Sequence, residues 1–325
     1  MKGFKKIFGY LKGYLNQEFN LFLFLFLGVF LTAAIWFNYT YNLEKGILDG
    51  RRNMPGYFWL NMLYYAIPYL VGCLGLVMFY KDNSNTTQTG MVRKGQFFTK
   101  PGFWLVLFIF CLSLSGDSWF RWYDWFTVPF EAKYYLRKMT SKIVRASFYI
   151  VPILIYYLVV RKRKGSFFGL TTKGFDKQPY LIMMLIMVPL LIWASFDASF
   201  LKAYPTYKLG SIEGFYGLSN WITFAPYELF YAITFIALEI LFRGFLIFEM
   251  EKYLGEKVVI PMVCVYCTLH FGKPMMECIS SIFGGFILGV IALRTRSVYG
   301  GVWVHIFIAV GMDLLAFLQK EYFMK

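Results

Sequence analysis

Residues 229–250 read LFYAITFIALEILFRGFLIFEM, a stretch of 22 residues in which only Glu239, Arg243 and Glu249 are charged. About 20 predominantly apolar residues in a helix cross the hydrocarbon core of a bilayer. Within lipid a helix satisfies its own backbone hydrogen bonds, whereas an open sheet leaves backbone groups unpaired. The stretch therefore predicts a membrane-spanning helix and sets the fold class of the chain.

Similar apolar runs recur along the rest of the chain. Of its 325 residues, 58% are hydrophobic and only 16% are charged, against roughly 25% charged residues in soluble domains. The pattern predicts an all-α polytopic membrane protein with about nine transmembrane helices in one bundle, or eight if the nearly continuous seventh and eighth runs count as one. The expected spans are residues 19–37, 57–80, 103–115, 146–161, 180–196, 229–250, 258–272, 277–293 and 299–318.

Lysine and arginine lie mainly in short connections beside apolar runs, which accounts for the net charge of +15 without a nucleic-acid partner. The N-terminal lysines and the cationic run 161–164 are both expected on the cytoplasmic side. The first apolar run is expected to be retained, because no small-residue cleavage pattern follows Trp36. We accordingly predict an integral protein of a bacterial cytoplasmic membrane, with a cytoplasmic N-terminus, membrane lipids as partners and no nucleic acid.

Three long connections are expected between these spans. Residues 81–102 and 197–226 are polar and contain Gly or Pro, which predicts loops. Residues 116–145 are expected outside the cell, although they carry six cations. Trp119, Trp122 and Trp125 recur there at three-residue spacing, and on a helix this spacing forms an aromatic stripe typical of the headgroup layer. We interpret the stripe as an interfacial anchor.

Ionisable residues inside the spans are few, and they are the candidates for chemistry, because burying a charge in a membrane is costly. Glu239 and Arg243 are four residues apart, so they share one helix face and can pair, either structurally or in an active site. The chain has only two histidines, His270 and His305. At about 1.5 Å per residue, Glu239, His270 and His305 lie roughly 16, 20 and 10 Å from the cytoplasmic end, which allows them to converge.

Three sequence pieces follow one another in a characteristic order: Glu239-x-x-x-Arg243-Gly244, Tyr266-x-x-x-His270, and His305 before a helical C-terminus. In this order they resemble the motifs of the CAAX-protease and bacteriocin-processing (CPBP, Abi) family of intramembrane proteases. The resemblance covers about residues 228–318. It divides the chain into an N-terminal transmembrane region of unassigned role, 1–200, and a CPBP-like domain, 201–325.

The chain departs from the family pattern at two positions. Leu238 stands where family members commonly carry a first glutamate, so the chain is a single-Glu variant. Ala309 stands where an asparagine is usual. Asp313, one helical turn further on, is a candidate to interact with the same face as His305.

The resemblance implies an intramembrane endopeptidase that hydrolyses a peptide bond of a membrane-associated peptide or protein substrate. Glu239, together with His270, would activate a water as general base. His305 would donate to the developing oxyanion, and Arg243 would support Glu239. The alternative, motivated by Leu238 and Ala309, is a catalytically inactive CPBP-like membrane scaffold or immunity protein that binds a partner.

No metal or other cofactor is expected. The alternative is zinc held by Glu239, His270 and His305, because two histidines and a carboxylate with one open position suit hydrolytic zinc. The motif His-Glu-x-x-His of zinc proteases does not occur in the sequence. The pair Cys264 and Cys267 offers soft ligands, but in an apolar run cysteine typically acts as a small buried hydrophobe.

Two further acids lie near the predicted site. Glu277, at the start of the eighth span, fits a favourable interaction with the helix dipole, and the alternative is that it supplies a second carboxylate. Glu228 shares a face with Glu239, but helical rise places it about 16 Å away, too far to share a water. The eighth span also offers a small-residue face for close helix packing, formed by Gly284, Gly285 and Gly289.

Overall fold

The computed structural model describes residues 2–79, 92, 95–120, 129–173, 175–210 and 212–323. These residues form helices, short 3₁₀ and π segments and connections, with no strand among them. Eight segments of the described chain are long and apolar enough to cross a membrane. The prediction of an all-α polytopic membrane protein is thus confirmed, with the lower of the two expected span counts.

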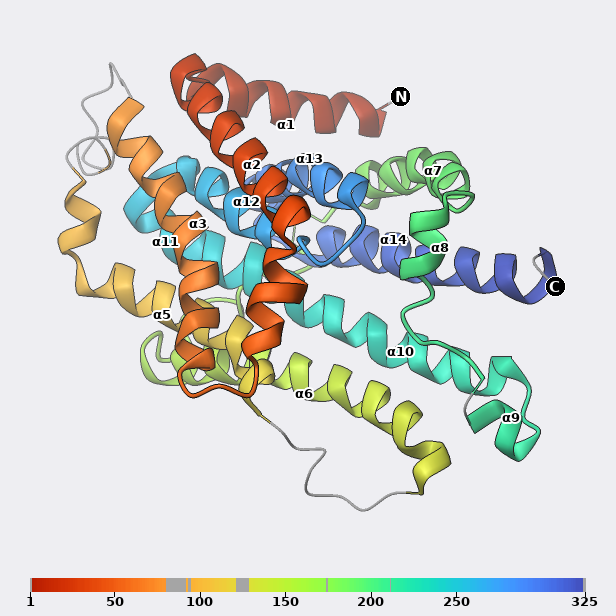
Figure 1. Ribbon diagram of the computed structural model, residues 1–325. Helices are drawn as coiled ribbons and strands as arrows, with labels where there is room; N and C mark the ends of the chain where they lie inside the picture. The colour runs from red at the N-terminus through yellow and green to blue at the C-terminus, as the bar shows by residue number, and fades with distance from the viewer. Residues whose placement is uncertain are drawn as a thin grey trace.

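The helices pack in one bundle, and α10 lies between α6 and α14 (Figure 1). The elements are α1 (Lys2–Glu18), α2 (Leu21–Tyr41), the π-helix η1 (Leu43–Leu48), α3 (Tyr57–Phe79), α5 (Pro101–Trp119), α6 (Phe130–Val159), α7 (Lys177–Ala194), α8 (Ala198–Ala203), α9 (Ile212–Tyr216), α10 (Asn220–Glu239), the π-helix η5 (Ile240–Leu246), α11 (Ile247–Leu254), the 3₁₀ segment η6 (Gly255–Val258), α12 (Val259–Thr268), α13 (Met275–Thr295), α14 (Tyr299–Leu318) and the π-helix η7 (Gln319–Phe323).

The predicted sixth and seventh spans form one apolar segment with a break. Asn220–Thr268 counts as a single candidate span of 49 residues. Within it, α11 ends at Leu254 and is capped by Gly255, whose φ of +61° is accessible to glycine, and η6 turns the chain into α12. With ten residues, α12 is about 15 Å long, too short to cross a membrane alone. The seventh predicted span is therefore a half-length helix.

The same segment forms the centre of the bundle. In its most apolar window 72% of the residues are buried, against 17% for Lys177–Ala194 and 22% for Phe130–Val159. The outer helices present large apolar side chains on their exposed surfaces, among them Phe22, Leu185 and Trp193. A charge on Asn220–Thr268 is therefore shielded from lipid by neighbouring helices.

Helix α6 is much longer than predicted. It begins at Phe130, so the prediction of a connection is wrong for residues 130–145. Their charges mask the helix in a hydropathy profile, but the structure gives these charges partners. Arg145 donates to Asp117 at 2.6 Å, and the Lys142 ammonium lies 4.2 Å from the ring centroid of Tyr231.

Helix α1 is an addition to the predicted elements. Ile7 and Tyr14 are buried, whereas Phe4 and Phe8 are more than half exposed. The helix packs on α7 and α13, along the outside of the bundle (Figure 1). A helix with one buried face and exposed lysines and phenylalanines is typical of the membrane interface.

Two of the predicted loops are only partly loops. Within 197–226, the short helices α8 and α9 form, and α10 already begins at Asn220. In 95–102, a 3₁₀ segment forms at Gln96–Thr99 and α5 begins at Pro101.

Most of 81–102 lies outside the described residues. Trp119 is the last residue of α5, and Trp122 and Trp125 lie outside the described residues, so the aromatic stripe stays a prediction.

Side chains of α2, in the N-terminal half of the chain, form hydrogen bonds to the connection between α12 and α13, which contains His270. Asn38 donates from its side chain to the carbonyl of Phe271 at 2.9 Å. The Tyr39 hydroxyl donates to the carbonyl of Lys273 at 2.7 Å. Because buried carbonyls need partners, these two bonds fix a turn that is otherwise outside the helical hydrogen-bond pattern.

Glu44 lies against the same turn and makes stability depend on pH. Burial, followed by the negative charge of Asp49, raises the pKa of the Glu44 carboxyl to about 7. Between about pH 4.3 and 7 the folded protein therefore retains a proton that the unfolded chain has released, so stability falls as pH rises through this window. We expect the melting temperature in detergent to decrease from pH 5 to 8, and Glu44→Gln to remove most of that decrease. Glu131→Gln, at the start of α6, is the control, and an equal slope in both variants would contradict the assignment.

Close packing in the C-terminal half relies on small residues, as predicted for α13. A Cβ at Gly285 would approach Cδ1 of Tyr266 to 2.8 Å, and one at Gly289 would approach Cε of Met262 to 2.6 Å. Gly284 faces open space, so the small-residue face comprises two of the three predicted glycines. The cysteines are free and buried, as expected: Cys73, Cys111, Cys264, Cys267 and Cys278.

Candidate active site

Glu239 lies at the centre of the bundle, where α10 passes into the π-helix η5. Short π segments within helices are frequently associated with functional sites. The carboxylate and the guanidinium of Arg243, within η5, are both fully buried. The four-residue spacing that predicted a pair is confirmed, because Arg243 Nη1 donates to Glu239 Oε1 at 2.9 Å.

His305 completes a three-residue cluster. Its Nδ1 lies 2.8 Å from Oε1 of Glu239, so one carboxylate oxygen contacts both the histidine and the arginine. The facing positions of α10 and α14 create this contact, and Phe235 packs on the His305 ring at a centroid distance of 4.5 Å. The His305 side chain keeps 11% of its surface exposed, whereas Glu239 keeps none. Access to the cluster therefore runs past the imidazole.

The ring of Tyr266, on α12, packs against the guanidinium of Arg243 and lies near the imidazole of His305. The Arg243 guanidinium carbon lies 4.1 Å from the centroid of the Tyr266 ring, a cation–π geometry that stabilises a desolvated charge. The His305 ring centroid lies 6.3 Å away on the same tyrosine. In the sequence Tyr266 is noticeable only as the first residue of its motif, and its contact with Arg243 depends on helix packing.

His270 lies next to this cluster without a direct bond to Glu239. Its ring centroid is 4.8 Å from that of Tyr266, and its Nδ1 is 2.9 Å from the Tyr266 carbonyl. A carbonyl can only accept, so Nδ1 of His270 carries the hydrogen. The structure therefore brings Glu239, Arg243 and His305 together, and it places His270 one aromatic ring away.

The two positions that depart from the family pattern are apolar in their surroundings as well. Leu238 is 6% exposed and belongs to the main apolar core. Ala309 is 6% exposed and packs among tyrosines, including Tyr227 and Tyr231. Asp313 is fully buried but accepts from the backbone N–H and hydroxyl of Thr206, so no bond links it to His305.

The other two acids lie apart from the cluster. Glu277 is in the first turn of α13, as the dipole interpretation predicts, and it accepts from the Tyr204 hydroxyl at 2.6 Å. Glu228 lies in the part of α10 that faces Asp313 rather than Glu239, and both of its carboxyl oxygens are buried. Among the described side chains, Glu239 is the only carboxylate bonded to the histidine and arginine.

No group of three or more His, Cys, Asp or Glu side chains within the described ranges is arranged to hold a metal ion. Cys267 faces Cys278 with a sulfur–sulfur distance of 3.8 Å, instead of forming a site with Cys264.

Residues 219–311 match the family model of type II CAAX prenyl endopeptidase Rce1-like proteins. This match is consistent with the CPBP family of CAAX proteases. The match contains all three motif pieces and agrees with the resemblance predicted for residues 228–318. No curated protein and no solved structure matches the chain.

Gly301 on α14 lies within the matched residues 219–311 but belongs to none of the three sequence motifs. A Cβ at this position would overlap Oε2 of Glu239, so the carboxylate lies directly on the glycine backbone. We expect Gly301→Ala to destabilise the protein by about 1–3 kcal/mol, because it overpacks a fully buried site.

Gly284→Ala is the matched control, since the same change there meets open space and improves helix propensity by up to about 1 kcal/mol. Thermal unfolding of both variants in detergent tests this prediction. Equal melting temperatures for the two variants would show that the close contact between Gly301 and the Glu239 carboxylate does not contribute to stability.

Proposed function

We propose that the chain is an intramembrane endopeptidase that hydrolyses a peptide bond of a membrane-associated substrate. The observation that supports this most is the buried cluster of Glu239, Arg243 and His305, which lies within the residues that match the Rce1-like family model. Ionisable residues at such depth are costly. A structural pair would need only Glu239 and Arg243, whereas His305 extends the cluster to a partly exposed edge.

In this proposal Glu239 positions the base instead of acting as the base. Its Oε1 receives hydrogen bonds from Arg243 and His305, so this oxygen already has two donors and is not free to take a proton from a water. His305 donates through Nδ1, which leaves a lone pair on Nε2. A histidine oriented by a carboxylate is the arrangement that serves as general base in hydrolytic triads.

The reaction then proceeds with the two imidazoles sharing one water. Nε2 of His305 removes a proton while the water oxygen attacks the peptide carbonyl carbon. The same imidazolium returns the proton to the leaving nitrogen, so the products are a carboxylic acid and an amine. His270, whose Nδ1 is fixed by the Tyr266 carbonyl, offers a second Nε2 lone pair to orient the water.

Peptide cleavage by purified protein tests the proposal. We would reconstitute the full chain in lipid vesicles and incubate it with a prenylated peptide ending in a CAAX sequence, and with the unprenylated peptide, because the matching family model is that of CAAX prenyl endopeptidases. Mass spectrometry should detect cleavage with wild type and with Gly284→Ala, and cleavage at least about a hundredfold slower with His305→Gln. Wild-type protein that leaves both peptides intact would contradict endopeptidase activity on this substrate class and would favour a binding scaffold.

The mechanism is proposed to need no metal. It uses only the protein groups named above, and the zinc alternative requires Glu239, His270 and His305 on one ion. Elemental analysis of the purified, active protein distinguishes the two. Stoichiometric zinc, together with loss of activity on chelation, would overturn the metal-free mechanism.

We further propose that the N-terminus faces the cytoplasm. Lys6 on α1 pairs with Asp176 at 3.0 Å, and Arg161 pairs with Glu249 at 3.4 Å. Asp176 and Arg161 both belong to the short connection between α6 and α7, so the N-terminal lysines and the cationic run 161–164 lie at the same end of these two helices. Collecting cations on one side fits a cytoplasmic face. Labelling single cysteines introduced at Lys162 and Lys133 with an impermeant maleimide tests this, and preferential labelling at Lys162 in intact cells would reverse the orientation.

A further inference from the structure

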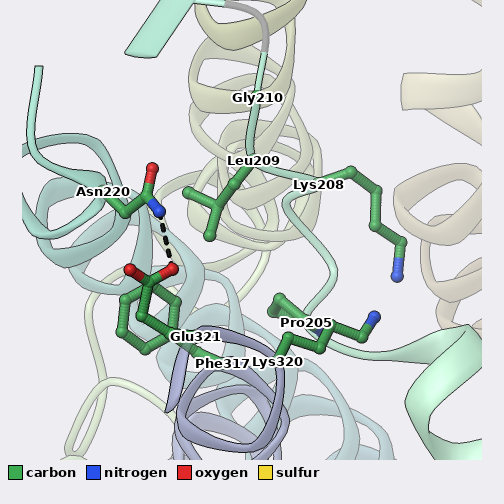
Figure 2. A pocket seen from close by; sticks show the side chains of 8 residues that line it. All are labelled: Pro205, Lys208, Leu209, Gly210, Asn220, Phe317, Lys320 and Glu321. Atoms are coloured by element: carbon green, nitrogen blue, oxygen red, sulfur yellow. Dashed lines mark hydrogen bonds between the residues drawn. The ribbon is translucent and has the colours of Figure 1, made fainter. Parts of the chain in front are cut away.

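A pocket of about 300 Å³ lies where the start of α10 meets the end of α14. Figure 2 shows its lining, which combines apolar walls with four polar side chains. The lining residues are Pro205, Lys208, Leu209, Gly210, Asn220, Phe317, Lys320 and Glu321. This volume is at the lower end of the roughly 300–1,000 Å³ found for small-molecule sites.

Two lysines supply the positive charge of the pocket. Their ammonium groups point to the same side of it, away from Asn220 (Figure 2). Burial, followed by repulsion from Lys320, lowers the pKa of Lys208 to about 8. Among the described residues, the carboxylate of Asp313 attracts both lysines, but no carboxylate lies within ion-pair distance of either ammonium. Two neighbouring cations thus share one more distant carboxylate and lack a direct counter-ion.

The protein backbone holds these cations in place. Lys208 Nζ donates to the carbonyls of Lys202 and Ala203 at 3.1 and 3.2 Å. Lys320 Nζ donates to the carbonyl of Tyr204 at 2.7 Å. An ammonium has three hydrogens, so one on Lys208 and two on Lys320 are left for a ligand. The opposite wall is different, because Glu321 accepts from Asn220 there at 2.7 Å.

We propose that this pocket binds a phosphate anion between Lys208 and Lys320, either the phosphate of a phospholipid headgroup or free phosphate. An anion with several acceptor oxygens can engage both ammonium groups at once and remove their mutual repulsion. The pocket lies at the ends of two apolar spans, Asn220–Thr268 and Tyr299–Phe323, which is the depth of the headgroup layer. Leu209 and Phe317 would contact the apolar part of a lipid.

The pocket is separate from the proposed catalytic cluster. Phe317 is 12 residues beyond His305 on the same helix, which corresponds to about 18 Å along the axis. The anion site therefore does not depend on the proposed peptidase activity, and its test measures binding alone.

Binding to purified full-length protein in neutral detergent tests the proposal. We would titrate a short-chain phosphatidylglycerol, the corresponding phosphatidylcholine and inorganic phosphate, with native mass spectrometry for the lipids and thermal stability for phosphate. We expect one saturable site, and about tenfold weaker binding for Lys208→Gln and for Lys320→Gln, because each removes a charge-assisted hydrogen bond. Lys173→Gln, which removes an exposed charge in the connection between α6 and α7, should change binding by less than about twofold.

Each outcome either identifies the source of the bound phosphate or rejects the proposed site. Saturable binding of the lipids but not of inorganic phosphate identifies a headgroup site, and binding of inorganic phosphate that competes with both lipids identifies a free-phosphate site. If Lys320→Gln does not fold, Lys208→Gln carries the comparison, since its side chain is at the surface. The proposal is overturned if Lys208→Gln binds as tightly as Lys173→Gln, or if none of the three probes binds saturably.

Discussion

Glu239→Gln is expected to destabilise the protein by about 3–5 kcal/mol and to abolish peptide cleavage. The stability effect arises because Arg243 is fully buried and Glu239 is its only ion-pair partner among the described residues. Removing one member of a buried ion pair leaves an uncompensated charge in a low-dielectric interior. The loss of cleavage follows because glutamine cannot orient and stabilise His305 as a carboxylate does. Thermal unfolding in detergent and the peptide assay measure the two effects separately.

A matched control and a double variant separate charge from chemistry. Glu251→Gln breaks the surface pair with Arg296 and should cost no more than about 1 kcal/mol. Replacing both Glu239 and Arg243 with leucine removes the buried charges together, so it should recover much of the stability lost in Glu239→Gln without restoring cleavage. A Glu239→Gln variant that is as stable and active as Glu251→Gln would show that the buried pair has neither role.

Local sequence spacing predicts those parts of the site that lie on one helix. Glu239 and Arg243 are four residues apart in an apolar run, and a regular helix leaves them only one shared face. The bond between them therefore follows from the sequence alone. The contact with His305 does not, because helical rise gives the depth of a side chain but not the rotation of its helix about the axis.

His270 shows the limit of this reasoning. Its predicted depth came from counting residues along a seventh span, but α12 ends at Thr268 and His270 lies in the turn that follows. Beyond the helix end, neither depth nor face follows from periodicity. Its position depends on Tyr266 and on side chains of the N-terminal half, such as Asn38, more than 200 residues away in the chain.

The fold was predicted best where apolar side chains face lipid and least well where charges lie on helices. The apolar run that forms α2 predicts a membrane-spanning helix without ambiguity, because a helix that crosses the hydrocarbon core needs about 20 apolar residues. The sequence pattern places the start of helix α6 too late, because the cations from Lys133 to Arg145 resemble those of a loop. Those charges are stabilised by tertiary contacts, such as that of Arg145 with Asp117, which no single-helix pattern contains.

His305→Gln is expected to lower kcat by about 10²–10⁴-fold, the usual contribution of a positioned general base. Glutamine can still donate an N–H to Oε1 of Glu239, so the buried carboxylate keeps two donors and the melting temperature should change little. A merely structural histidine would show the opposite pattern, with lost stability and retained turnover. Measuring kcat and KM separately, with thermal unfolding alongside, distinguishes these cases.

The smaller variant His305→Gly adds a test that folding defects cannot imitate. Removing the ring leaves space beside Phe235, and added imidazole can occupy that space and accept the proton from water. We expect imidazole to restore part of the lost kcat in His305→Gly but not in Glu239→Gln, because the free base in the first variant still has its orienting carboxylate. Equal rescue of both variants would mean that Glu239 does not position the base, and turnover within tenfold of wild type in His305→Gln would remove His305 from the reaction.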